Sequence, residues 1–257
     1  MKIISWNING LRAAVKKGLM ERLFKMDADI VLLQEIKAKP YQLTKAQSDF
    51  GEYKAIYNSA FRKGYSGTMV LSRVDIQEVY LDLGQLEYDD EGRCLAIVLD
   101  DLIIYNCYYP NGGRGDEFVQ KKIGFYQNVS KKAMDWAGKG YRVILTGDFN
   151  TAYSEMDLAR AKENKNNTGF LPIEREALED CFYNNGFIDI YRSLYPDKVE
   201  YTWWDQKTRA RERGIGWRID YFLLNLDKFN KYQLDSYILA DDYYAISDHS
   251  PVALEIH

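Results

Sequence analysis

Residues 143–150 read VILTGDFN, an apolar run that closes on a carboxylate and an amide. A short apolar run bounded by a turn signal predicts a strand that is buried on both faces. Gly147 lets the chain turn sharply, so that Asp148 and Asn150 project from the end of this strand. Taken alone, the same tetrapeptide is also compatible with an ordinary Asp/Asn turn.

Four more apolar runs carry a polar group at one end, and they read IISWN at 3–7, IVLLQE at 30–35, DYFLL at 220–224 and DHSPVALEI at 248–256. Three of the five runs end at their polar group and two begin at it. Strands of opposite direction would therefore bring all five polar ends to one rim. Oxygen ligands and one histidine at such a rim predict a site for a hard divalent cation beside an acid–base group, which indicates an enzyme.

The order of the predicted elements indicates an α/β fold with mixed sheets. We expect helices at 11–26, 116–138 and 172–184, and strands at 2–7, 29–34, 53–58, 67–72, 93–99, 102–108, 142–147, 200–204, 219–225, 234–240 and 251–256. Hairpins alternate with strand–helix–strand units, which implies mixed rather than purely parallel sheets. Runs that are apolar on both faces predict two sheets packed face to face with helices outside.

The sequence contains no internal repeat, low-complexity tract or Pro/Ser-rich linker, which predicts a single domain over residues 1–257. The polar segment 151–170 is longer than the usual structureless connection, so we expect a functional loop there. An ordinary surface loop without a function could have the same length.

Composition sets the general class of protein. The chain has 257 residues and a hydrophobic fraction of 46%, which is enough for a sizeable core. No apolar stretch approaches the roughly 20 residues of a membrane span, and the first predicted strand leaves no room for a signal peptide. We therefore expect a cytoplasmic protein that does not bind a membrane. We also expect it to be a monomer. Three cysteines without C-x-x-C spacing predict buried, inert thiols.

Charge is distributed unevenly along the chain. The net charge of −4 argues weakly against a nucleic-acid partner, yet residues 202–218 hold five basic side chains against two acidic ones. Three tryptophans surround this basic stretch, Trp203, Trp204 and Trp217, and they fit either core packing or an apolar pocket or stacking surface beside phosphates. The glycine-rich loops 64–67 and 111–115 carry hydroxyl, amide and guanidinium groups that suit phosphate contact.

Two candidate residues have plain structural alternatives. Glu35 could bind a metal ion or form a local salt bridge with Lys37. His249 could be a buried structural histidine, but Asp248 precedes it and Asp220 could orient its ring, as in hydrolytic triads. A metal ion and a base can activate water directly, so no serine or cysteine nucleophile is needed.

Several motifs together resemble the exonuclease III family of apurinic/apyrimidinic endonucleases. They lie at 6–12, 33–35, 64–67, 89–93, 147–150, 155–158, 216–220 and 247–249 and follow the family's order along the whole chain. The resemblance implies a four-layered α/β sandwich, and Mg²⁺-dependent hydrolysis of the phosphodiester 5′ to abasic sites in duplex DNA, with Mn²⁺ as a substitute ion. It also implies a 3′→5′ exonuclease activity and the cleaning of blocked 3′ ends, which are DNA-repair reactions.

The resemblance also assigns site residues. Metal binding would fall to Glu35, Asn7, Asn9 and Asp248. Catalysis would fall to His249, Asp220, Asp148, Asn150 and Tyr108. Substrate contacts are expected from Trp203, Trp217, Ile219, Asn111, Arg114, Asn164, Asn167, Lys207 and Arg209.

In these assignments Asp148 aligns or deprotonates the attacking water, and His249 stabilises charge on the phosphate. Trp203, Trp217 and Ile219 line a pocket for a baseless sugar. Asn9 stands where many eukaryotic members have aspartate, which would weaken metal affinity or alter metal choice.

Two rival functions remain at this point. Another phosphodiesterase or phosphatase with the same sandwich could act on RNA, undamaged DNA or inositol phosphates. A non-catalytic nucleic-acid-binding protein could keep the same scaffold. Two features, the set Trp203, Trp217 and Ile219 and the basic segment 207–218, favour damaged duplex DNA over a small soluble substrate. A binding module has no need of the complete set Glu35, Asp148, Asp220 and His249.

Overall fold

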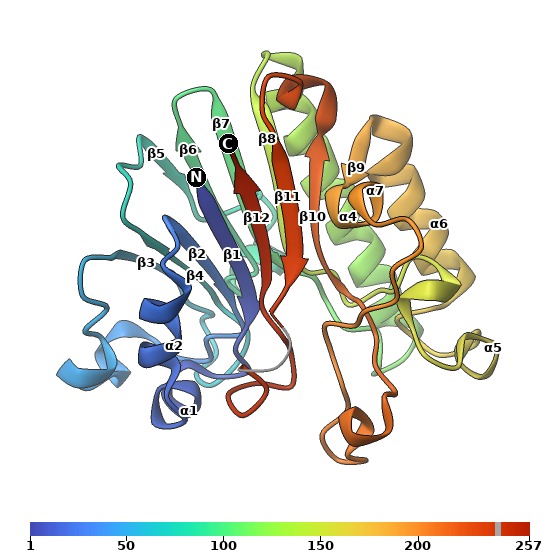
Figure 1. The fold of residues 1–257 in the computed structure, drawn as a ribbon, viewed down its shortest axis with the longest axis horizontal. Coiled ribbons are helices and arrows are strands. Elements are labelled where there is room, and N and C mark those ends of the chain that lie inside the picture. Colours follow the sequence, from blue (N-terminus) through green and yellow to red (C-terminus); the bar gives the residue numbers. More distant parts are fainter. Residues whose placement is uncertain (240–242) are drawn as a thin grey trace.

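Two six-stranded sheets form the centre of the molecule (Figure 1). The computed structural model describes residues 1–239 and 243–257. The first sheet has the order β11-β12-β1-β2-β4-β3 and contains β1 (Lys2–Asn7), β2 (Ile30–Gln34), β3 (Lys54–Asn58), β4 (Thr68–Ser72), β11 (Leu234–Ile238) and β12 (Val252–Ile256). The second has the order β5-β6-β7-β8-β10-β9 and contains β5 (Glu78–Tyr80), β6 (Cys94–Leu99), β7 (Leu102–Tyr108), β8 (Arg142–Asp148), β9 (Phe187–Asp189) and β10 (Asp220–Asn225).

Both sheets are mixed. β1 runs parallel to β2 and antiparallel to β12, while β8 runs parallel to β7 and antiparallel to β10. Helices cover the outer faces, and their bounds are α1 (Leu11–Lys16), α2 (Leu19–Met26), α3 (Leu86–Asp89), α4 (Asp116–Gly138), α5 (Ala161–Asn164), α6 (Pro172–Cys181) and α7 (Ile190–Leu194). Figure 1 shows α4 and α6 on the far side of the second sheet from the first.

The alternation of side chains along each strand builds the layers. In β1, Ile3 points into the core between the two sheets, whereas Ile4 packs with α1 and α2. In β8, Ile144 joins the core between the sheets, and Val143 and Leu145 pack against α4. The apolar runs are therefore buried on both faces, and the predicted sandwich of two mixed sheets with helices outside is confirmed.

The directions of the strands explain the position of the site. The carboxyl ends of β1, β2 and β8 lie at the same rim as the amino ends of β10 and β12, because β10 and β12 run antiparallel to their neighbours. Asp220 lies directly opposite Asp148 in the pairing of β10 with β8. The predicted meeting of the five strand ends at one rim is thus confirmed.

Some predicted elements were wrong. The helix expected at 11–26 is two helices, because the chain turns at Gly18 in a left-handed conformation (φ 95°). The helix from 172 ends at Cys181 rather than near 184. The short elements β5, β9 and α7 were not predicted, since three to five residues carry too little periodicity to be recognised.

The strand expected at 200–204 is also absent from the described residues, where Trp203 forms only isolated bridges with Trp217 and His249. The backbone N–H of Trp204 donates to Asp248, so this segment pairs briefly with two different neighbours instead of continuing one ladder. The strand expected at 234–240 is observed over Leu234–Ile238, and residue 240 lies outside the described residues.

All three cysteines are free and buried, as predicted, with Cys94 opposite Cys107 across β6 and β7. Among the described residues, no helix is both long and apolar enough to cross a membrane.

Candidate active site

Three of the polar residues at the rim have an unusual backbone conformation. Asn9, Glu35 and Asn150 all have φ values near +50° (47°, 51° and 52°). Asparagine tolerates this left-handed region, but a glutamate there costs about 1–2 kcal/mol. Gly147 is required for a different reason, since a Cβ there would lie 1.9 Å from the backbone oxygen of Cys107. Strained positions of this kind cluster at functional sites.

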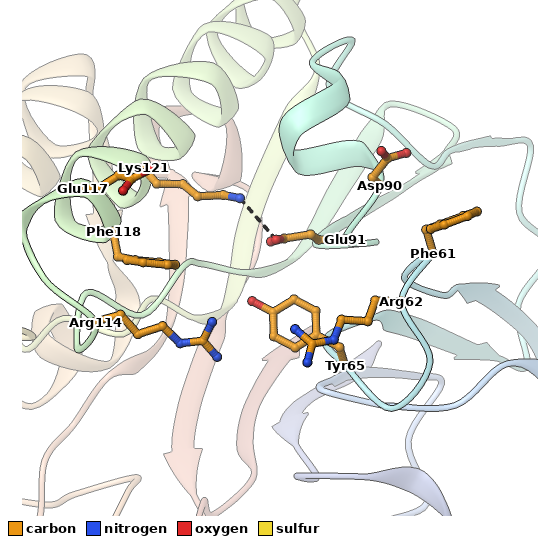
Figure 2. Close-up of a pocket in the computed structure, with 9 residues that line it drawn as sticks. All are labelled: Phe61, Arg62, Tyr65, Asp90, Glu91, Arg114, Glu117, Phe118 and Lys121. Atoms are coloured by element: carbon orange, nitrogen blue, oxygen red, sulfur yellow. Dashed lines mark hydrogen bonds and ion pairs between the residues drawn. The ribbon is translucent and has the colours of Figure 1, made fainter.

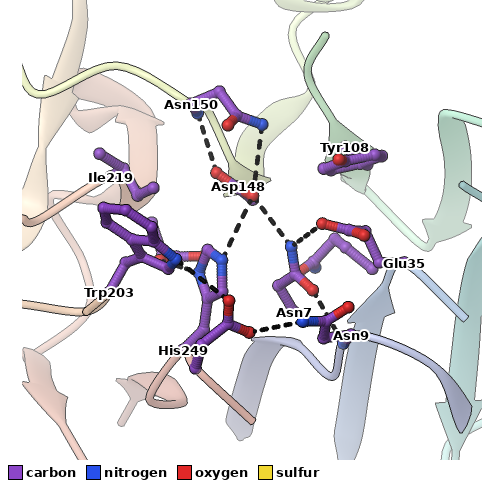
Figure 3. Close-up of polar contacts among 12 residues, drawn as sticks. Asn7, Asn9, Glu35, Tyr108, Asp148, Asn150, Trp203, Ile219 and His249 are labelled. Atoms are coloured by element: carbon purple, nitrogen blue, oxygen red, sulfur yellow. Dashed lines mark hydrogen bonds and ion pairs between the residues drawn. The ribbon is translucent and has the colours of Figure 1, made fainter. Parts of the chain in front are cut away.

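His249 forms the centre of one side of the site (Figure 3). Its Nδ1 lies 3.0 Å from Asp220 Oδ2, and its Nε2 lies 3.7 Å from Asp148 Oδ2. All three residues are almost completely buried, with exposed fractions of 4% or less. The indole of Trp6 donates to the backbone oxygen of His249, so this loop is anchored to β1.

The charges of this trio shift one another's protonation. Burial alone would lower the pKa of His249, but the Asp220 and Asp148 carboxylates next to it raise that pKa to about 10. Burial raises the pKa of Asp148 to about 7, with the charges of Asp220 and Glu35 adding to the rise and His249 opposing it. At neutral pH His249 is therefore an imidazolium, and Asp148 is poised to exchange a proton.

Two amides hold Asp148 in place. Asn7 Nδ2 donates to both Asp148 Oδ2 and Glu35 Oε1, at 2.9 Å each. The backbone N–H of Asn150 donates to Asp148 Oδ1 at 2.9 Å. The side-chain Nδ2 of Asn150 donates to the carbonyl of Tyr109 at 2.8 Å. Asn7 thus links the His249 side of the site to the Glu35 side.

The Glu35 side is more open to solvent. Lys37 Nζ lies 2.6 Å from Glu35 Oε2 and 2.5 Å from Asn9 Oδ1. The salt bridge that the sequence allowed between Glu35 and Lys37 is therefore present. Asn9 Nδ2 donates to Asp248 Oδ1 at 2.9 Å, and Trp203 Nε1 donates to Asp248 Oδ2 at 3.2 Å. Burial alone would raise the pKa of Asp248, but the His249 charge and these two hydrogen bonds hold it below its ordinary value.

Two groups of residues could hold a metal ion. The ligand atoms of Asp148, Asp220 and His249 all lie within 4.8 Å of one another. A protonated His249 has no lone pair to offer, however, and both of its ring nitrogens face carboxylates. On the other side, Glu35 and Asn9 direct oxygens at one positive charge, the Lys37 ammonium. Convergent carboxylate and amide oxygens are what a hard divalent cation requires, so the Glu35 side fits the metal better.

An apolar wall adjoins these polar groups. A cavity of about 390 Å³ is lined by three apolar side chains, Trp203, Trp217 and Ile219, and by the polar residues Glu35, Tyr108, Asp148 and His249. The wall is backed by a small core cluster of Ala152, Leu158, Phe170 and Ile219. Burial raises the pKa of the Tyr108 hydroxyl well above its usual range, with the Glu35 charge adding to the rise, so Tyr108 remains a neutral donor.

The other residues expected to contact substrate differ in whether they line this cavity. Asn111 lines it and donates to Asn150 Oδ1 at 2.8 Å. Arg114 lies in an adjoining groove rather than in the cavity itself. The remaining four, which do not line the cavity, are Asn164, Asn167, Lys207 and Arg209. Their roles stay predictions.

Sequence reasoning missed several residues of the site. Thr168 and Gly169 line the cavity and belong to the segment 151–170, whose length was the available signal. Thr202 Oγ1 accepts the backbone N–H groups of Ile219 and Asp220, which fixes the start of β10. Nothing in the sequence distinguishes Thr202 from other threonines, because its role depends on the fold.

Comparison with known proteins identifies the family. Residues 4–249 match the model of the Endonuclease/Exonuclease/phosphatase family. This chain belongs to that family. It is 39% identical to an exodeoxyribonuclease of Bacillus subtilis (strain 168) over the full length of both chains. It is 37% identical to the DNA repair nuclease APEX1 of Danio rerio, over 88% of this chain and 73% of that protein.

Solved structures support the same fold. An AP endonuclease from Archaeoglobus fulgidus superposes with a TM-score of 0.89 at 24% identity, over 100% of this chain and 99% of that one. The predicted family resemblance is thus confirmed, as are the predictions of a nuclease and of a role in DNA repair. Divalent-metal chemistry is the chemistry of this family's nucleases, and the oxygens of Glu35 and Asn9 that converge on one cation agree with it.

Proposed function

We propose that the chain hydrolyses the phosphodiester 5′ to abasic sites in duplex DNA and uses Mg²⁺, with Mn²⁺ able to replace it. One observation carries this proposal: the apolar wall of Trp203, Trp217 and Ile219 shares a single cavity with His249 and Asp148. A baseless sugar costs little to extrude from the helix and can pack against such a wall. A 3′→5′ exonuclease activity and the removal of blocked 3′ ends would use the same cavity.

The roles of the residues follow from their positions. Asp148, whose pKa is raised by burial, accepts a proton from the attacking water. The imidazolium of His249, held by Asp220, offers its Nε2–H to an oxygen of the scissile phosphate. The neutral Tyr108 hydroxyl faces the same cavity and donates to a reacting oxygen. Asn150 also lines this cavity, and its Nδ2 donates to Tyr109 and Asp148, so it holds Asp148 beside the reacting oxygens.

The metal would be held by Glu35, with Asn9, Asp248 and Asn7 around it. A divalent ion supplies charge that offsets the negative charge of the phosphate in the transition state. Asn7 already donates to Glu35 and Asp148, so it acts by orienting these two carboxylates. We further propose that residues 1–257 form one catalytic domain that acts as a monomer in the cytoplasm.

A nicking assay tests the proposal. A duplex with one tetrahydrofuran abasic analogue should be cut immediately 5′ to the analogue when Mg²⁺ is present, and should stay intact in excess EDTA. An undamaged duplex of the same sequence should be cut far less. Equal cutting of the two duplexes would remove the abasic-site assignment while leaving a nuclease.

A further inference from the structure

A second cavity lies beside the candidate active site and is not explained by the chemistry of incision. It has a volume of about 400 Å³ and two walls (Figure 2). Phe61, Arg62 and Tyr65 form one wall, from the loop between β3 and β4. Arg114, Glu117 and Phe118 form the other wall, at the start of α4. We call this cavity the aromatic slot.

A smaller cavity connects the slot to the active site. It holds about 230 Å³ and is lined by three cations, Arg93, Arg114 and Lys121, with no carboxylate among its lining residues. It shares Tyr108 and Asn111 with the catalytic cavity, and Arg114 and Phe118 with the aromatic slot. A continuous groove therefore leads from the scissile position, past a cationic bay, into the slot.

The chemistry of the bay suits a phosphate. Arg93 is buried and donates to the hydroxyl of Tyr65 at 3.0 Å, so the ring and the guanidinium are fixed relative to each other. Glu91, which lines the slot, is paired with both Arg93 and Lys121. Its single negative charge offsets only part of the charge of Arg93, Arg114 and Lys121, so the bay keeps a positive excess. A DNA strand that enters the catalytic cavity can place a further phosphate in this bay.

The chemistry of the slot differs, because flat groups dominate it. Arg114 lies over the ring of Phe118 at 5.4 Å, and Arg62 lies over the ring of Tyr65 at 5.5 Å. Phe61 is 81% exposed, the largest exposed fraction among the large hydrophobic side chains of the described residues. Lys39 contacts this ring from the side of the β2–β3 connection, at 5.4 Å from its centroid. Aromatic rings and guanidinium planes are the groups on which unpaired nucleobases stack.

We propose that the aromatic slot binds one unpaired nucleobase of the DNA strand whose phosphate lies in the cationic bay. A base in a regular duplex is stacked and paired, so it cannot enter the slot without first leaving the helix. The slot thus gives the chain a preference for DNA with a mismatched or unpaired nucleotide near the cut. This inference rests on the proposed function, which places the DNA strand in the catalytic cavity so that it can run on into the slot. Binding of a base in the slot can still be tested without incision.

Direct binding measurements test the slot. A fluorescein-labelled duplex without an abasic site is titrated with protein in EDTA, by fluorescence anisotropy, while a single mismatch is moved along it one position at a time relative to a fixed end. We expect one position to bind at least about fivefold more tightly than the fully paired duplex, as expected for one base stacked on an aromatic side chain. Phe61→Ala should reduce this gain, and the double variant Phe61→Ala/Phe118→Ala should abolish it.

Phe24→Ala is the matched control, because it removes an exposed phenylalanine from α2, outside the groove. This control should keep the full gain, and circular dichroism should show that all variants are folded. The proposal is overturned if no mismatch position improves binding, or if the gain survives in the folded double variant. A gain that depends on Phe61 in a protein that fails to cut abasic duplexes would support the slot and refute only the proposed function.

Discussion

The two sides of the candidate active site differ in how firmly their charges are fixed. On the His249 side, three charged groups are almost completely buried, and both ring nitrogens face carboxylates. On the Glu35 side, the carboxylate is paired with the Lys37 ammonium, whose side chain is 30% exposed. The buried side is therefore preorganised to hold a proton, while the open side can exchange one cation for another. This difference suggests separate tasks, with proton and phosphate chemistry on one side and metal binding on the other.

The largest loss of incision activity is expected from a substitution on the buried His249 side. His249→Ala should lower single-turnover incision of the abasic duplex by about 10³-fold, because it removes the imidazolium that offsets the charge on the phosphate. Binding of the same duplex, measured by gel shift, should change little. His257→Ala is the control, since it removes the other histidine, which is exposed. Wild-type rates in the His249 variant would remove this residue from the mechanism.

Substitutions on the open Glu35 side are expected to change the Mg²⁺ concentration that incision requires, which is a smaller effect. Glu35→Gln should raise the Mg²⁺ concentration needed for half-maximal incision by at least about 10-fold, since the site loses a negative charge. Asn9→Asp should shift the same midpoint downward, because it adds one. The metal titration of incision measures both. If neither variant moved the midpoint, the metal would have to bind on the His249 side.

The apolar wall should affect discrimination more than turnover. Trp217→Ala should reduce the preference for abasic over intact duplex by about 10-fold, since the wall then packs less closely against the extruded sugar. Specificity ratios from competition between the two duplexes measure this. Trp136→Ala, which removes a tryptophan of α4 outside the cavity, should leave the ratio unchanged. An unchanged ratio in the Trp217 variant would contradict the assignment of the pocket.

The smallest effect concerns the protonation of His249. In a His257→Ala background only one imidazole remains. In the metal-free protein its two ring nitrogens should keep the ¹⁵N chemical shifts of an imidazolium from pH 6 to 8, because the pKa of His249 is raised to about 10. This interaction stabilises the fold fully below pH ~6.5, the pKa in the unfolded chain, and the stabilisation is lost as the pH rises through about 10. Asp220→Asn should bring the titration back toward neutral pH. Ring nitrogen shifts of a neutral imidazole above pH 7 without that substitution would show that Asp220 does not hold the proton.

The same contrast explains how much of the site could be predicted. Asp148, Asp220 and His249 could be found because each lies beside a long apolar run whose direction and end are visible in the sequence. The contact of Lys37 with Asn9 could not be predicted from the sequence, since it depends on how two loops meet after folding. The strand expected at 200–204 failed for a related reason: Thr202, Trp203 and Trp204 pair with different neighbours, and apolar patterning does not report such divided pairing.

Short strands could not be predicted from the sequence either. β5 and β9 have three residues each, and they form because longer strands already present an edge for pairing. The break at Gly18 was visible as a residue but not as a turn, because a single glycine is tolerated inside many helices.

The division of labour between the two sides can be tested by locating the metal. Crystals soaked in Mn²⁺ and measured at the manganese absorption edge should show an anomalous peak next to the Glu35 carboxylate, with Lys37 moved away from it. In the same map the Nδ1 atom of His249 should remain hydrogen-bonded to Asp220. A peak bonded to His249 and Asp148, with Glu35 still paired to Lys37, would contradict this account.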